Sequence, residues 1–488
     1  MADSLKQKTV SGALWSGIHK FSITLLGFIS GIVLARLLTP HDYGVIGMLT
    51  IFLAVSQTFI DGGFGSALIQ KKTPSDEDYS TILFWNLGLS VFLYFVLFFS
   101  APFIARFYEL PLLVDVLRVQ SIVLVINAAR IVQHNQLRKK LQFKKVALIN
   151  VTSSIISLCV TIYLAYIGWG VWALVVQQLV LGLSCTVLYW ITSKWRPLLT
   201  FSITSFKELF GFGGFILLSN LFNTFCNNIQ GLLIGKVYNS ATLGYYSKAM
   251  RTESYASTFF SSVLDQVSYP VLSETQNDKD RLGRILRIFI GTSAFITFPL
   301  MFLLILVAKP LFLLLYSERW LDSVPYFQLL CIAGIAISLQ NINYYAVAAL
   351  GKSKQLFKWT FLKRILGLLF ILVGIYFFGI FGMIAGSVLA SWTIYLINAN
   401  LASKYAGYSL KRQLVDLLPV AVLCLTAFIV AFIIGYWIDV NIYLLSLVQS
   451  SIFVVIYIFF SWVFNFESLD STKYILSIIK KKLNVYKL

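Results

Sequence analysis

Long runs of apolar residues, broken by short polar and charged segments, recur along the whole chain. Each run has about 20 residues, the length of a helix that crosses a bilayer. Outer-membrane barrels are excluded, because their strands alternate polar and apolar positions over only about 10 residues. The pattern therefore predicts an all-α polytopic membrane protein with about fourteen transmembrane helices. The predicted spans lie near residues 11–37, 42–67, 80–104, 112–137, 146–167, 171–192, 208–236, 242–270, 288–308, 323–350, 361–378, 382–402, 413–437 and 443–464.

Composition and charge support a membrane location and fix an expected orientation. The chain has 58% hydrophobic and only 12% charged residues, whereas a soluble protein has about a quarter charged residues, so a soluble enzyme is excluded. With the N-terminus inside, most of the 39 lysines and arginines fall on the cytoplasmic side, notably those of residues 138–145. We therefore expect a multi-pass membrane protein with both termini cytoplasmic. Anionic lipid, and not nucleic acid, accounts for the net charge of +19.

An internal repeat is visible at an offset of 200 residues. The segment GIVLAR at 31–36 matches GLLIGK at 231–236, and Gly44 matches Gly244 without a gap. The repeat predicts two six-helix lobes, residues 1–200 and 201–405, that enter the membrane in the same sense. Two additional helices at 406–465 and a basic amphipathic cytoplasmic tail at 466–488 complete the predicted organisation.

Two helix starts have clear local chemistry. Thr39 and Thr73 are each followed by proline and, three residues later, by an aspartate. This order is typical of a threonine N-cap with proline at the first helical position and an acid near the free amides. We therefore expect helices to begin directly after Thr39 and Thr73.

Charged and amide side chains recur within the predicted spans, where charge is costly. Cations outnumber nearby acids, so pairing alone does not neutralise them. We therefore expect a hydrated cationic cavity suited to an anionic ligand, above all phosphate. The alternative is that these groups satisfy one another between packed helices. The candidate substrate-binding residues are Lys20, Arg118, Arg130, Asn220, Asn223, Asn227, Lys248 and Arg251.

Asp61 opens the glycine-rich segment DGGFG at 61–65, near the end of a predicted span. It is a candidate for coupling to H+ or Na+, or it pairs with a basic loop. The three histidines lack metal-ligand spacing, so no metal is expected. Gly351-Lys352-Ser353 ends like a phosphate-binding loop, but the required upstream glycine is Ala346, so no nucleotide-driven transport and no cofactor is expected.

Five segments carry a resemblance to a known family. They are LARLLTPHDYG at 34–44, DGGFGSALIQ at 61–70, FWN at 84–86, APFIARFY at 101–108 and GWGVWALV at 168–175. The chain resembles bacterial polysaccharide exporters and lipid-linked oligosaccharide flippases of the multidrug/oligosaccharidyl-lipid/polysaccharide (MOP) superfamily, in particular the colanic-acid and teichuronic-acid exporter branch. His41 departs from the acidic residue usual at its position, so no role is carried over to it.

The resemblance implies two six-helix lobes around a central cavity, two additional C-terminal helices and alternating access. It further implies a non-enzymatic flippase that moves undecaprenyl-diphosphate-linked oligosaccharide units for surface polysaccharide synthesis. An anionic lipid-linked oligosaccharide is then the expected partner, together with membrane lipids and polysaccharide-assembly proteins. The alternatives are a membrane-embedded polymerase or ligase, which needs larger outer loops, and a multidrug cation antiporter, whose substrates a cationic cavity would repel.

Overall fold

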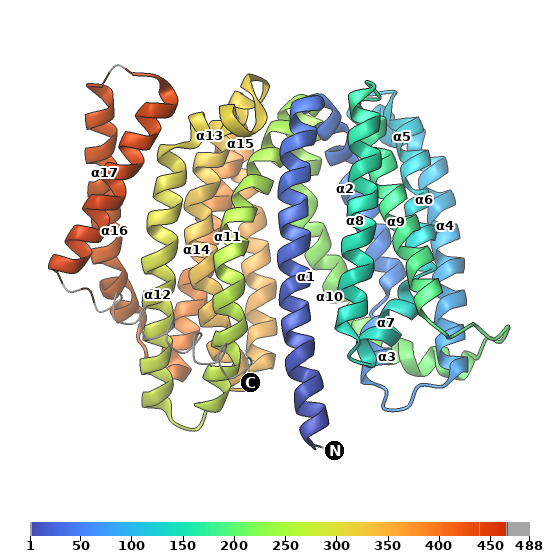
Figure 1. Ribbon diagram of the computed structural model, residues 1–488. Coiled ribbons are helices and arrows are strands. Elements are labelled where there is room, and N and C mark those ends of the chain that lie inside the picture. Colours follow the sequence, from blue (N-terminus) through green and yellow to red (C-terminus); the bar gives the residue numbers. More distant parts are fainter. Residues whose placement is uncertain (1, 439, 465, 467–488) are drawn as a thin grey trace. The chain divides into compact units, whose positions relative to one another are not determined.

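The computed structural model describes residues 2–438, 440–464 and 466, and every regular element in this part is a helix (Figure 1). The chain divides into two compact units, Met1–Ser247 and Lys248–Leu488. The first unit contains α1 (Ala2–Leu37), α2 (Pro40–Asp61), α3 (Phe64–Gln70), α4 (Asp76–Tyr108), α5 (Leu113–Gln120), α6 (Ile122–Ala128), α7 (Ile131–Lys139), α8 (Phe143–Tyr166), α9 (Val171–Thr192), α10 (Ile203–Val237) and the first turns of α11 (Ser240–Glu274). The second contains the rest of α11, α12 (Lys279–Leu306), α13 (Ala308–Tyr316), the 3-10 helix η1 (Glu318–Ser323), α14 (Val324–Ala349), α15 (Ser353–Ala406), α16 (Leu410–Tyr436) and α17 (Ile442–Val463).

The predicted fold class, a polytopic helical membrane protein, is confirmed. Ten of the described helices are long and apolar enough to cross a membrane, and an eleventh is added if two segments of α10 that meet at 58° form one bent span. The number of about fourteen spans stays a prediction, as does the lobe boundary after residue 200. The predicted amphipathic tail at 466–488 lies, apart from Phe466, outside the described residues.

The sequence repeat corresponds to a reciprocal contact between the starts of α2 and α11. A Cβ on Gly44 would lie 1.6 Å from the carbonyl oxygen of Ser240, and a Cβ on Gly244 would lie 1.9 Å from that of Pro40. Residues 40 and 240, like 44 and 244, differ by the offset of the repeat. Equivalent residues that contact each other crosswise are the mark of two-fold symmetry. Both glycines are needed because the two backbones touch.

One predicted helix start is right and the other is displaced. Thr39 caps α2, with its hydroxyl accepting from the Asp42 amide at 3.3 Å and its own amide donating to the Asp42 carboxylate at 2.9 Å. The prediction of Thr73 as a cap is wrong, because Ser75 caps α4 through the same reciprocal bonds with Asp78. The helix begins beyond Pro74, and a residue directly before proline is disfavoured from the helical conformation, so the cap falls on Ser75.

Two predicted spans are interrupted. After α2 the chain turns through Gly62 and Gly63, with φ of 52° and 72°, and α3 follows. A Cβ on Gly63 would also lie 2.4 Å from the carbonyl oxygen of Gly213 in α10, so this glycine serves both the turn and a close approach. The predicted span at 112–137 is divided into α5, α6 and α7, with breaks at Ser121 and at residues 129–130.

The spans predicted at 361–378 and 382–402 form a helical hairpin within α15. Gly379 has φ of 62° and ψ of −147°, so the chain reverses there. Gly374 faces the backbone of Gly382, and Gly386 faces the carbonyl oxygen of Phe370, each too closely for a Cβ. These pairs are nested around the turn, as in two antiparallel helices. Both predicted spans are therefore helical, with backbones in direct contact.

Candidate site for an anionic ligand and a coupling ion

Asp61, at the end of α2, lies at one end of a polar network in the first unit. Gln57, one turn earlier, donates to its carboxylate at 3.0 Å, and Asn127 of α6 donates to Gln57 at 3.3 Å. Arg130, at the break between α6 and α7, is close enough to attract the Asp61 carboxylate. The break between α6 and α7 thus places Arg130, a predicted substrate-binding cation, near Asp61, the predicted coupling acid. Gln57 and Asn127 connect them to the packed interior.

A second polar chain runs from α7 to α1 through α9 and α8. His134 Nδ1 lies 2.8 Å from the Tyr189 hydroxyl, which donates to Asn150 Oδ1 at 3.4 Å. Asn150 Nδ2 lies 3.2 Å from His19 Nε2. Arg130 and Arg138 act electrostatically on His134, so this chain joins the surroundings of Asp61. Sequence reasoning gave Tyr189 and Asn150 no role, because each is a single polar residue in an apolar run.

The other candidates of the first unit lie in different surroundings. Arg118 is half-buried on α5, with its guanidinium 4.3 Å from the centre of the Phe98 ring and its Nε donating to the Phe98 carbonyl at 3.4 Å. Lys20 on α1 is exposed. The structure thus brings Arg130 to Asp61, whereas Arg118 packs on α4.

The asparagines of α10 lie on a helix that packs against α2. Asn220 and Asn227 are exposed, and Asn223 is half-buried. Beside them, the hydroxyls of Thr224 and Thr58 of α2 lie 3.0 Å apart. The amides are therefore presented on the helix that contacts the element bearing Asp61.

The two cations of the second unit are held differently. Lys248 is 4% exposed, and its ammonium lies 4.0 Å from the centre of the Tyr316 ring and 5.2 Å from that of Trp320. Arg251 is exposed, and its Nε donates to the Tyr255 hydroxyl at 3.2 Å. The side chains of Ser262 and Asp265, which continue the polar pattern of α11, lie outside the described part. Of the two cations, Arg251 is the exposed one and Lys248 the enclosed one.

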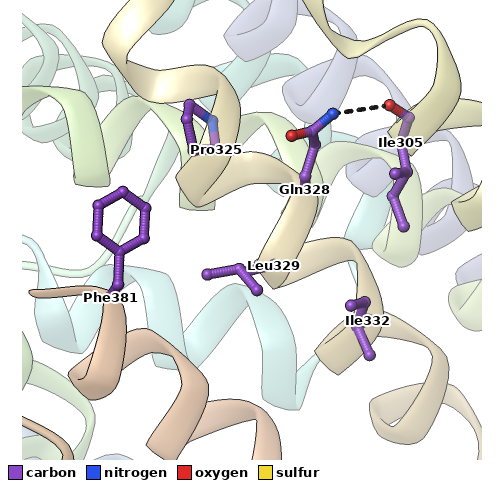
Figure 2. Close-up of a pocket in the computed structure, with 6 residues that line it drawn as sticks. All are labelled: Ile305, Pro325, Gln328, Leu329, Ile332 and Phe381. Atoms are coloured by element: carbon purple, nitrogen blue, oxygen red, sulfur yellow. Dashed lines mark hydrogen bonds between the residues drawn. The ribbon is translucent and has the colours of Figure 1, made fainter. Parts of the chain in front are cut away.

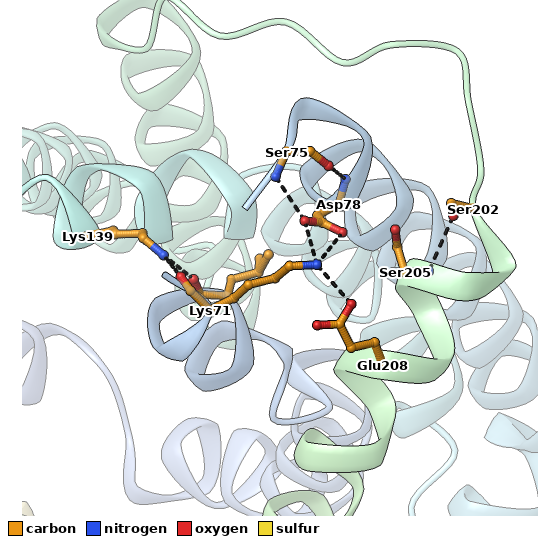
Figure 3. A network of polar contacts seen from close by, with 8 residues as sticks. Lys71, Ser75, Asp78, Lys139, Ser202, Ser205 and Glu208 are labelled. Atoms are coloured by element: carbon orange, nitrogen blue, oxygen red, sulfur yellow. Dashed lines mark hydrogen bonds and ion pairs between the residues drawn. The ribbon is translucent and has the colours of Figure 1, made fainter. Parts of the chain in front are cut away.

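An ion-pair network joins the start of α10 to the loop between α3 and α4 (Figure 3). Lys71 Nζ lies 3.0 Å from Asp78 and 2.9 Å from Glu208, and Lys139 donates to the carbonyl oxygen of Lys71. The hydrogen bond with Glu208, together with Asp78, raises the pKa of Lys71 above its ordinary value. This cluster was missed from the sequence, since 137 residues separate Lys71 from Glu208. It ties four helices of the unit together.

The second unit has a hollow of about 380 Å³ on its apolar surface (Figure 2). Its lining comes from the ends of α12 and α14 and from Phe381 in the hairpin of α15, and Gln328 donates to the Ile305 carbonyl at 3.1 Å. The lining residues are Ile305, Pro325, Gln328, Leu329, Ile332 and Phe381. With its single amide already bonded, the hollow has no chemistry for an anion, and none of the predicted site residues lines it.

The fold is that of lipid flippases and multidrug transporters. It matches a solved structure of the lipid II flippase MurJ, in an inward closed conformation, with a TM-score of 0.75 over 93% of this chain and 98% of that chain, at 16% identity. An inward-facing multidrug resistance MATE family transporter of the MOP superfamily matches with a TM-score of 0.59, over 79% of this chain and 94% of its own, at 15% identity. At these identities the likeness defines the fold alone.

The family is defined by sequence. A profile described as "Polysaccharide biosynthesis protein" matches residues 33–325, and the chain belongs to this family. It is 28% identical to the teichuronic acid biosynthesis protein TuaB of Bacillus subtilis (strain 168), over 73% of this chain and 74% of the relative. It is 24% identical to the lipopolysaccharide biosynthesis protein WzxC of Escherichia coli (strain K12), over 84% and 85%. The resemblance of the chain to polysaccharide biosynthesis proteins is confirmed, and its fold is shared with a transporter of the MOP superfamily.

Proposed function

We propose that this protein is a flippase for undecaprenyl-diphosphate-linked oligosaccharide repeat units. It moves them by alternating access from the inner to the outer leaflet of the bacterial cytoplasmic membrane, for surface polysaccharide such as lipopolysaccharide O-antigen, capsule or exopolysaccharide. Membership of the polysaccharide biosynthesis family supports this proposal. So do relatives that carry teichuronic acid and lipopolysaccharide biosynthesis in their names, and a fold shared with a lipid II flippase.

The observation that carries the proposal is the exposed guanidinium of Arg251 on α11, which forms no ion pair with the residues that the structure describes. Within the described part of the chain, neither Arg130 nor Arg251 belongs to an ion pair with atoms within 4.0 Å. An unneutralised guanidinium in a membrane protein is costly unless it meets water or an anionic ligand. Its planar fork matches the oxygens of a diphosphate. These cations therefore favour an anionic lipid-linked substrate.

The candidate residues take different parts in this proposal. Arg130 in the first unit and Arg251 in the second each offer a guanidinium to a diphosphate or an acidic sugar, and the exposed Asn220 and Asn227 of the first unit offer amides to sugar hydroxyls. Lys248, enclosed by aromatic rings, adds positive potential from within α11. The isoprenoid tail stays in the bilayer throughout.

The two other functions fit the observed chemistry less well. A polymerase or ligase needs acid and base groups on a substantial loop, but the segment between α13 and α14 is the six-residue helix η1. A cation antiporter would have to attract its substrate past Lys20, Arg130 and Arg251, which repel positive charge. We therefore propose a non-enzymatic role with an anionic substrate.

A variant of Arg251 tests the proposal in proteoliposomes loaded with a lipid-linked oligosaccharide. Arg251→Gln removes the charge and the fork, which is expected to cost about 1.5–3 kcal/mol of substrate binding and so about tenfold or more in transport at subsaturating substrate. Arg251→Lys is expected to retain part of the activity. Tyr255→Phe is the matched control, because it removes the hydroxyl that accepts from Arg251 and leaves the Arg251 guanidinium in place.

The variants separate transport from folding. The proposal predicts that Arg251→Gln lowers transport while the amount of protein in the membrane stays normal. An equal loss in Tyr255→Phe and Arg251→Gln would assign Arg251 a local structural role. Normal transport by Arg251→Gln would remove Arg251 from the substrate site, and no transport of lipid-linked oligosaccharide by the wild type would refute the proposed function.

A further inference from the structure

Glu253 is a buried acid of α11 that the substrate site does not use. Its side chain is 6% exposed, and its Oε1 has no hydrogen-bond partner among the residues that the structure describes. The Ser257 hydroxyl, one turn along the same helix, lies near the carboxyl group and donates to the Ser254 carbonyl oxygen at 3.4 Å. A carboxyl oxygen enclosed without a partner requires an explanation, because an unsatisfied buried polar group is destabilising.

The surroundings of this oxygen on α14 and α12 are small and apolar. A Cβ on Gly334 would lie 2.3 Å from Oε1, so the glycine makes room for the carboxyl group. Met301 of α12 lies against the same glycine, and Cys331 of α14 interacts electrostatically with Glu253. The carboxyl group therefore occupies a fitted space between helices and not a random packing defect.

The charged residues near Glu253 in the sequence of α11 contact side chains other than Glu253. On its own helix, the Lys248 ammonium lies over the rings of Tyr316 and Trp320, and Arg251 is exposed and bonded to Tyr255. From α14 the titratable group is the Cys331 thiol, which brings no positive charge. An ionised carboxylate in such a space is costly, and a group so placed is neutralised by taking up a proton.

We propose that Glu253 is a proton-binding site that couples protonation to transport. This inference rests on the proposed flippase function and names its coupling ion and residue. The protonated carboxyl group fits the closed packing of α11 on α14. Release of the proton leaves a carboxylate that needs water, which favours a state in which this packing opens.

The same geometry argues against sodium at this position. A sodium ion needs several oxygen ligands. Around Oε1 the structure has the backbone of Gly334 and the side chains of Met301 and Cys331, and the nearby hydroxyl is that of Ser257. A proton requires only the carboxyl group itself. Sodium coupling is therefore an outcome that would contradict the inference.

Carbodiimide labelling tests the site directly, because dicyclohexylcarbodiimide reacts with protonated carboxyl groups in apolar surroundings. The full-length protein in lipid nanodiscs is labelled across pH 6–9 and analysed by mass spectrometry. Glu253 is expected to be labelled at pH 6, less so as pH rises, and more than Asp416, which pairs with Arg287. Absence of labelling at Glu253 at pH 6, or labelling that does not change with pH, overturns the proposal.

Transport in proteoliposomes tests the coupling. An imposed gradient of one pH unit is expected to raise substrate accumulation about tenfold in the wild type if one proton moves per cycle. Glu253→Gln, which mimics the protonated form, is expected to keep substrate exchange and lose this response. Asp61→Asn is the comparison, since Asp61 is the other candidate acid.

The transport measurements distinguish coupling through Glu253 from coupling through Asp61, from sodium coupling and from the absence of coupling. A pH response that persists in Glu253→Gln and disappears in Asp61→Asn overturns the assignment to Glu253. Accumulation driven by a sodium gradient in place of a proton gradient also overturns it. Exchange without any gradient response in the wild type contradicts the coupling but leaves the flippase function intact. Absence of exchange contradicts the flippase function, and the labelling result then decides on the proton site alone.

Discussion

Replacing Gly44 with alanine tests the reciprocal contact between α2 and α11. The new Cβ would lie 1.6 Å from the Ser240 carbonyl oxygen, where real Cβ contacts stay beyond 3.0 Å. The two backbones must therefore separate by about 1.4 Å, and overpacking of this kind costs about 1–3 kcal/mol. Alanine gains about 0.5–1 kcal/mol in helix propensity over glycine, so the net loss is expected to lie between about 0 and 2.5 kcal/mol, with about 1 kcal/mol as its middle value.

The matched control is Gly88→Ala on α4, because a Cβ there meets no atom within 4 Å. This variant is expected to gain the propensity term without overpacking. Thermal unfolding in detergent, followed by fluorescence-detected size exclusion, should show a fall of a few degrees for Gly44→Ala and none for Gly88→Ala. Gly244→Ala is expected to resemble Gly44→Ala, and the double variant should lose less than the sum, since either change opens the same crossing.

Two results would contradict a direct backbone contact between α2 and α11. If Gly44→Ala unfolds at or above the wild-type temperature, the backbones do not touch at this crossing. If the two single variants add fully in the double variant, the glycines do not share one contact.

Four further variants test three other contacts. Lys71→Met should destabilise the protein by about 1–3 kcal/mol, because it leaves the buried carboxylate of Asp78 without its cation. Glu208→Gln should cost less than about 1 kcal/mol, because the Glu208 side chain is largely exposed. Thermal unfolding distinguishes the two variants, and equal losses would contradict the network. Since the pKa of Lys71 is raised, its contribution is fully present below the ordinary lysine pKa of 10.5 and is lost as pH rises through the higher folded value, so unfolding at pH 6 and pH 9 should show the same difference. Tyr189→Phe should cost about 1–3 kcal/mol by breaking the chain between two histidines, and an unchanged unfolding temperature would show that the hydroxyl is dispensable. Gly386→Val should abolish the hairpin contact of α15 and lower the amount of folded protein in the membrane, and normal abundance would contradict that contact.

The fold could be predicted from the sequence where a residue type occurs at a position for a single physical reason. Apolar runs predicted the helices because a bilayer demands about 20 such residues in a row. Gly44 and Gly244 were visible as a repeat because a crossing of touching backbones admits no side chain at either position. The breaks around residues 121 and 129–130 were not visible, since the residues there carry no proline or glycine signal.

The sequence identified the charged residues of the candidate site, but it did not identify most of their side-chain contacts. Arg130 and Asp61 were recognised as charged residues in apolar runs, and the helix break brings them together. Arg118 was recognised for the same reason, but its guanidinium packs on the Phe98 ring. The sequence does not distinguish an arginine that contacts an aromatic ring from one that binds a ligand. Asn150 and Tyr189 are hydrogen-bonded although 39 residues separate them in the sequence. No periodic pattern in the sequence predicts such a pair.

The central claim is that this protein moves a lipid-linked oligosaccharide between leaflets, and leaflet accessibility measures that step directly. In cells depleted of the protein, the lipid-linked glycan is labelled with a membrane-impermeant probe from outside and compared with the total after lysis. The flippase account predicts that the precursor accumulates while its outer, labelled share falls, and that the wild-type protein restores it. An unchanged outer share after depletion, with total precursor at its normal level, would contradict the account.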